Sequence, residues 1–124
     1  MTYMSEALPV LVLVRDLIFA SRITATAADV KTPLTLVRDA TKLVDHAAGV
    51  AGAMLIVDLN LAGAIDAARM WKAATGGTVT GFVSHVDTAT IAAARDGGID
   101  RVLARSRFVE LLPALLRGEP TGAD

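Results

Sequence analysis

The chain has 124 residues, enough for one domain around one core, and a net charge of −1 from 12 basic and 13 acidic residues. This balance excludes bulk attraction to nucleic acid or anionic lipid, and the lack of cysteine excludes disulfides, thiolate metal sites and cysteine nucleophiles. Apolar residues make up 53% of the chain and aromatic residues 4%, so the core must be aliphatic, as in strands covered by helices on both faces.

The N-terminal region carries no pattern typical of export or membrane insertion. The apolar stretch over residues 8–14 is shorter than the roughly 20 residues that a membrane-spanning helix needs. The first ten residues also lack the basic segment that begins a secretory signal. We therefore expect a cytoplasmic protein that does not associate with membranes.

Five short apolar runs alternate with segments of helical periodicity, which predicts a parallel sheet built from right-handed βαβ units. The expected strands are residues 10–14, 33–37, 54–57, 79–83 and 101–104. The first helix is expected over residues 17–28. Three further helical faces consist of Leu43, Ala47, Val50 and Ala51, of Ala64, Ala67, Ala68 and Trp71, and of Phe108, Leu111, Leu112 and Leu115. The prediction is a single three-layer α/β domain over residues 1–117, with a flexible tail over residues 118–124.

Several residues are suited to begin, end or interrupt these helices. Asp39 and Asp87 can cap the N-termini of the helices that follow them. The glycine pairs at residues 76–77 and 97–98 can end the helices before them. Pro113 falls inside the last helical pattern, so it predicts a kink or a delayed helix start, at a cost of about 3 kcal/mol if it is interior.

The most informative segment is LIVDLNLAG, residues 55–63. An apolar run leads directly into Asp58, and the chain then turns away. An acid at the carboxyl end of a parallel strand lies in the crevice where open α/β sheets bind ligands. The alternative is that Asp58 only caps the helix that follows.

Four motifs make the chain resemble the receiver domain of bacterial response regulators over nearly its whole length. DLNLAG, residues 58–63, is similar to the family's D-L-x-L-P-G, with Ala62 in place of the proline. VTGFVSHVD, residues 79–87, resembles the family's fourth strand, which ends in Thr or Ser. GGIDRVLARS, residues 97–106, looks like G-A-D-D-Y-L-T-K-P, and LVLVRD, residues 11–16, lies where receivers have two adjacent acids.

The resemblance implies a doubly wound (βα)5 fold with strand order 2-1-3-4-5 and a non-enzymatic phosphoacceptor site. Asp58 takes the phosphoacceptor position, and Ser84 provides the hydroxyl that contacts the phosphoryl group. Arg105 stands in place of the family's lysine. Mg²⁺ would be held by Asp16, by Asp58 and by the backbone carbonyl of Asn60, because Mg²⁺ prefers oxygen ligands.

The chain departs from the family pattern at four positions around this site. Arg15 replaces the first acid, which should weaken Mg²⁺ binding or abolish it. Arg105 keeps the positive charge of the lysine but presents a planar fork on a longer arm. Val102 takes the position of the rotating aromatic switch, and His85 follows Ser84 where a small residue is usual. These departures indicate an atypical member with an altered switch.

Charge counting suggests a hypothesis about the metal. Asp16 and Asp58 would face two arginines, so the site is near neutrality without an ion. A guanidinium of Arg15 or Arg105 could then take the place of the ion and pair with Asp58. Coulomb attraction at about 4 Å is worth roughly 1–4 kcal/mol between the dielectric of water and that of a protein surface.

Simpler explanations exist for several of these residues. Asp16 and Ser84 also fit ordinary polar residues at strand ends, and His85 fits a surface histidine. Trp71, alone on an alanine-rich helix, fits a packing residue. A solvated surface, rather than a phosphate-binding patch, best explains a group of arginines with no interleaved aromatics: Arg95, Arg101, Arg105 and Arg107.

Three functions remain open at this point. The first is a stand-alone receiver-like domain that is phosphorylated at Asp58 by a sensor histidine kinase or a phosphotransfer protein. The second is a pseudo-receiver that binds a downstream protein or a second copy through its fourth helix, fifth strand and fifth helix. Residues 92–94 and 111–116 would then supply apolar contact area. The third, a flavodoxin-like binder of a small ligand, is disfavoured because no glycine-rich loop follows the first strand.

Overall fold

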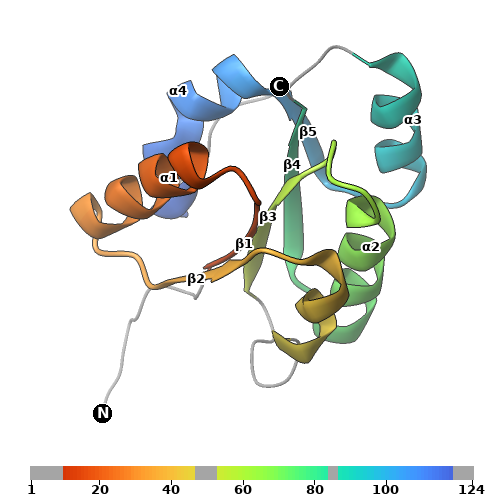
Figure 1. The fold of residues 1–124 in the computed structure, drawn as a ribbon, viewed down its shortest axis with the longest axis horizontal. Coiled ribbons are helices and arrows are strands. Elements are labelled where there is room, and N and C mark those ends of the chain that lie inside the picture. The colour runs from red at the N-terminus through yellow and green to blue at the C-terminus, as the bar shows by residue number, and fades with distance from the viewer. Residues whose placement is uncertain (1–9, 47–52, 84–86, 119–124) are drawn as a thin grey trace.

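The computed structural model describes residues 10–46, 53–83 and 87–118, which form a three-layer α/β domain (Figure 1). The strands are β1 (Val10–Leu13), β2 (Leu34–Val37), β3 (Met54–Asp58), β4 (Thr78–Val83) and β5 (Arg101–Ala104). The helices are α1 (Leu17–Asp29), the 3₁₀ helix η1 (Ala40–His46), α2 (Ala64–Thr75), α3 (Thr88–Asp96) and α4 (Arg105–Leu116).

The five strands are parallel and lie in the order β2-β1-β3-β4-β5, as predicted. The interior strand β1 is buried along its whole length, because helices cover both faces of the sheet. One face packs on α1 and α4 through side chains that include Val12, Ile56 and Phe82. The other packs on η1, α2 and α3, and its core includes Leu13 and Trp71. Figure 1 shows the two helical layers on opposite sides of the sheet.

The second crossover differs from the expected helix. The structure has the 3₁₀ helix η1, in which Leu43 is buried, and the other residues of the predicted face lie outside the described residues. The Asp39 carboxylate accepts hydrogen bonds from the N–H and the hydroxyl of Thr41, while its carbonyl accepts one from the N–H of Lys42. The carboxylate thus caps the start of η1, and the bond from Lys42 to the Asp39 carbonyl is of the i to i+3 type that defines a 3₁₀ turn.

Most of the other predictions of residues that begin or end a helix are confirmed. Asp87 caps α3 by accepting the N–H groups of Ala89 and Thr90, and Gly76 ends α2 in the left-handed conformation. Pro113 lies in the interior of α4, and this helix begins directly after β5. Of the two outcomes predicted for Pro113, the delayed helix start was therefore wrong, and the kink stays a prediction.

Two further expectations concern the chain ends and the membrane. The helix α4 ends at Leu116, and residues 119–124 lie outside the described residues, so the flexible tail remains a prediction. Within the described part of the chain, no helix combines the length and the apolar character needed to cross a bilayer.

Candidate functional site

Three charged side chains converge at the edge of the sheet where the parallel strands end. Asp16 follows β1, Asp58 is the last residue of β3, and Arg105 follows β5 as the first residue of α4. The guanidinium of Arg105 lies 3.6 Å from Oδ2 of Asp16. Both charges also act on Asp58, because Arg105 lowers the pKa of its carboxyl group and Asp16 raises it. The structure thus brings these three predicted site residues together.

The structure describes only some of the other predicted site residues. Ser84 and His85 lie outside the described residues, so their roles remain predictions. Asn60 lies beside Asp58, and its backbone N–H donates a hydrogen bond to Oδ1 of that carboxylate at 3.0 Å. Val102, at the position of the aromatic switch, is a partly buried aliphatic side chain packed against the core cluster on the α2 and α3 side.

The loop after Asp58 is anchored to β4 by its first residue. The N–H of Leu59 donates to the carbonyl of Phe82 at 3.0 Å, and the Leu59 side chain is buried. A Cβ on Gly81 would lie 2.6 Å from two carbons of the Leu59 side chain. Glycine is therefore required at this point of β4, because only a residue without a side chain leaves room for the leucine that fixes the loop.

Asp58 is partly buried, and this burial is the largest influence on its pKa. Removal of water from the carboxyl group disfavours its charged form and raises the pKa. The N–H of Asn60 and the charge of Arg105 lower the pKa, and the charge of Asp16 raises it again, but the net shift is upward. Asp58 is therefore the acid of the site whose surroundings disfavour its charged form, and a perturbed pKa of this kind is common among functional carboxylates.

Asp16 is the N-cap of α1 as well as a member of the charged cluster. Its Oδ1 accepts the N–H groups of Phe19 and Ile18, at 3.1 and 2.9 Å. The hydrogen bond from Phe19 is the largest cause of its lowered pKa, and Arg105 also lowers it. One carboxylate oxygen thus holds the helix, and the other faces the Arg105 guanidinium.

The Arg105 guanidinium lies over an aromatic ring that the sequence does not link to the site. Its guanidinium carbon lies 4.0 Å from the centroid of the Phe19 ring, a cation–π geometry. Phe19 packs against Phe82 and Phe108, which stack on each other with centroids 4.7 Å apart. The chain has three phenylalanines, and all of them meet here. This scarcity was the one available signal, but the sequence alone does not show that they cluster.

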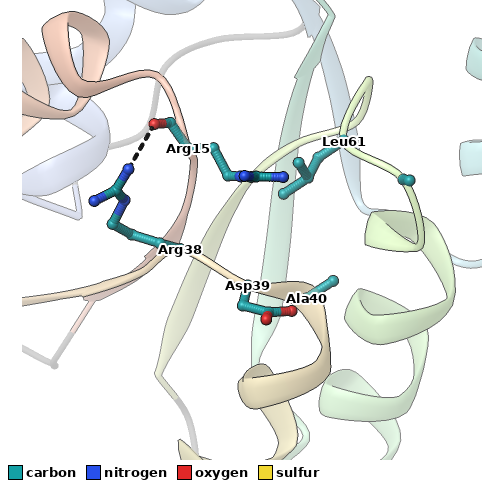
Figure 2. Close-up of a pocket in the computed structure, with 6 residues that line it drawn as sticks. Arg15, Arg38, Asp39, Ala40 and Leu61 are labelled. Carbon is teal, nitrogen blue, oxygen red and sulfur yellow. Dashed lines mark hydrogen bonds between the residues drawn. The ribbon is translucent and has the colours of Figure 1, made fainter.

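Arg15 directly precedes Asp16 but lines a separate cavity. Figure 2 shows its guanidinium directed toward Leu61, in a cavity of about 310 Å³ that Arg38, Asp39, Ala40 and Ala62 also line. The pKa of Asp39 is lowered chiefly by hydrogen bonds from Thr41 and also by the charge of Arg15. Of the two arginines considered for the place of the ion, Arg105 and not Arg15 faces the acids.

The donor set fits poorly with the Mg²⁺ site that the family resemblance implies. Among the described residues, no group of three or more His, Asp or Glu side chains could hold a metal ion. Asp16 and Asp58 are the two acids available, and the guanidinium of Arg105 lies against the first of them. A cation that belongs to the chain thus lies against one of the two carboxylates that a metal would need.

The two tasks of Asp16 can be separated by substitution. Asp16→Ala removes the cap of α1, so we expect its thermal midpoint to fall by a few degrees. Asp16→Asn keeps a capping side chain and loses only the charge that faces Arg105, so its midpoint should stay close to that of the wild type. Fluorescence of the single tryptophan, the buried Trp71, reports unfolding. Equal losses in both variants would contradict the capping role.

The raised pKa of Asp58 predicts a pH-dependent gain in stability on its replacement. The folded state binds the Asp58 proton more tightly than the unfolded state, so its contribution to stability is lost as the pH rises through the folded pKa. Asp58→Asn should therefore unfold a few degrees higher than the wild type at pH 7. This advantage should vanish below about pH 4, where the carboxyl group is protonated in both states. Asp66→Asn, an exposed acid on α2, is the control and should show no such gain. A destabilised Asp58→Asn at pH 7 would contradict the account.

Comparisons with known proteins bear on the fold. No protein-family model and no curated protein matches the chain. Among solved structures, the phosphorylated cyanobacterial phytochrome response regulator RcpA superposes with a TM-score of 0.74 at 14% identity, covering 91% of each chain. A Burkholderia pseudomallei response regulator with a phosphorylated aspartic acid and a calcium ion gives 0.75 at 18% identity, covering 87% of this chain and 65% of that one. A putative pilus assembly protein, CpaE of Burkholderia thailandensis, gives 0.69 at 17% identity, covering 90% and 96%. The chain therefore has the flavodoxin-like α/β fold of response-regulator receiver domains.

Proposed function

We propose that this chain is a receiver-like domain of two-component signalling and accepts a phosphoryl group at Asp58. The observation that carries the proposal is the position of this acid: partly buried, at the carboxyl end of β3, and within the field of Arg105 and Asp16. The nucleophile in such a transfer is the ionised carboxylate. The receiver fold and the motif around Asp58 support the same assignment.

The geometry around Asp58 suits phosphoryl transfer. A carboxylate oxygen forms a bond to phosphorus while the bond from phosphorus to the donor breaks, and the donor leaves with the bonding electrons. Oδ1 already accepts the N–H of Asn60, so we assign the attack to Oδ2. Negative charge spreads over the three transferring oxygens, and Arg105 supplies the nearby positive charge that stabilises them.

The donor would be a sensor histidine kinase or a phosphotransfer protein that reaches the site over the start of α1. Leu17 and Ile18 directly follow Asp16, and they expose 60% and 85% of their surface. Apolar side chains this exposed, next to a charged site, are suited to contact a protein. A donor that docks on them would bring its phosphoryl group to the edge of the sheet where Asp58 lies.

A second candidate is a phosphorylation-independent adaptor that binds a downstream protein or forms a homodimer through α3, β5 and α4. Val102 favours it, because an aliphatic side chain cannot perform the rotation of an aromatic switch. The contact area is smaller than the sequence suggested. Ala92 and Ala93 on α3 are exposed, but most of the leucines expected to offer apolar surface on α4 are buried in the core: Leu112, Leu115 and Leu116.

Intact-mass measurement after incubation with acetyl phosphate and Mg²⁺ tests the proposal. We expect the wild type to gain the mass of one phosphoryl group and Asp58→Asn to gain none, because the acceptor oxygen is gone. Asp66→Asn, which removes an exposed carboxylate on α2, is the matched control and should still be modified. If acetyl phosphate, phosphoramidate and a phosphotransfer protein all leave the wild type unmodified, the adaptor function replaces this one.

A further inference from the structure

We propose that the Arg105 guanidinium is the resident counter-charge of the Asp16–Asp58 pair, and that it keeps divalent metal ions out of this site. The inference deepens the proposed function and depends on it for its biological meaning. Metal binding is nevertheless measurable without phosphoryl transfer, so the two can fail separately.

The Arg105 guanidinium makes two contacts at once. Its guanidinium stacks on the Phe19 ring at 4.0 Å and lies 3.6 Å from Oδ2 of Asp16. Phe19 is itself buried and wedged against Phe82 and Phe108. A planar guanidinium can stack and pair with a carboxylate at the same time, whereas a lysine ammonium cannot reproduce both contacts. The arginine is thus held at the acids by two different kinds of contact.

Three of the four carboxylate oxygens also have partners already. Oδ1 of Asp16 accepts two backbone N–H groups at the start of α1, and its Oδ2 faces Arg105. Oδ1 of Asp58 accepts the N–H of Asn60. Mg²⁺ demands near-octahedral oxygen ligation, so binding here would require it to displace the guanidinium from Asp16.

The net charge of the cluster also disfavours a divalent ion. Two carboxylates and one guanidinium leave a single negative charge, which is a weak attraction for a doubly charged ion. Arg15 adds a second guanidinium next to Asp16 in the chain, with its own side chain directed into the adjacent cavity toward Leu61. Removal of Arg105 doubles the negative charge of the cluster and frees Oδ2 of Asp16. The same substitution should therefore create a metal site where none operates in the wild type.

One consequence concerns the phosphoryl reaction itself. If Arg105 supplies the positive charge, a chelator should leave the rate of Asp58 modification by acetyl phosphate unchanged within about twofold. This readout is secondary, because it presupposes that Asp58 is an acceptor.

The primary test is calorimetric titration of the full chain with MnCl₂ at pH 7, in the wild type, in Arg105→Gln and in Arg22→Gln. We expect the wild type to show no saturation over the titrated range and Arg105→Gln to saturate, which sets the difference in affinity at about tenfold or more, equivalent to about 1.4 kcal/mol. Arg22→Gln removes an exposed guanidinium from α1 away from the acids and should behave as the wild type. Trp71 fluorescence verifies that each variant is folded. If Arg105→Gln does not fold, Arg105→Lys, which keeps the charge but loses the stacked fork, should show a smaller gain.

Two results would overturn the inference. Saturable manganese binding to the wild type in the micromolar range would mean that Arg105 does not exclude the ion. A folded Arg105→Gln or Arg105→Lys that binds manganese no better than Arg22→Gln would mean that the other ligands, and not the guanidinium, limit the affinity of the site for manganese. Neither result depends on whether acetyl phosphate modifies Asp58.

Discussion

The contact between Arg105 and the ring of Phe19 is the constraint on which the chemistry of the site depends. It ties the cation to the three-phenylalanine cluster in the layer between the sheet and the helices α1 and α4. Because that cluster is part of the core, the guanidinium stays at the edge of the sheet. Asp16 then forms an ion pair with the guanidinium, and the positive charge of the guanidinium lowers the pKa of Asp58.

The sheet supplies the rigid frame for this arrangement. Its central strands are buried on both faces, so the positions at which β1 and β3 end are fixed by packing. Leu59 continues this packing one residue beyond Asp58 and fits over Gly81 of β4. Burial disfavours the charged form of the Asp58 carboxyl group, and the frame keeps this group at the end of β3. Functional groups are often held in unfavourable surroundings by a rigid fold in this way.

The sequence predicted the frame far better than the contacts across it. Periodicity and apolar runs found all five strands, and the position of Asp58 at the end of β3 followed from the same pattern. The 3₁₀ geometry of η1 was missed, because a capping aspartate such as Asp39 begins the α-helices α1 and α3 as well and does not distinguish the two helix types. The choice of Arg105 over Arg15 as the cation facing the acids was equally hidden. It depends on the direction of each arginine side chain and on Phe19, which is remote from Arg105 in the sequence.

The most direct test of the central claim is an NMR titration of the Asp58 carboxyl carbon in the wild type, Arg105→Gln and Asp16→Asn. The account predicts a pKa above the ordinary aspartate value in the wild type, because burial outweighs the hydrogen bond from Asn60. Loss of the Arg105 charge should raise this pKa further, and loss of the Asp16 charge should lower it. An Asp58 pKa that is the same in all three proteins would contradict the account, because it would show that the three side chains do not share one site.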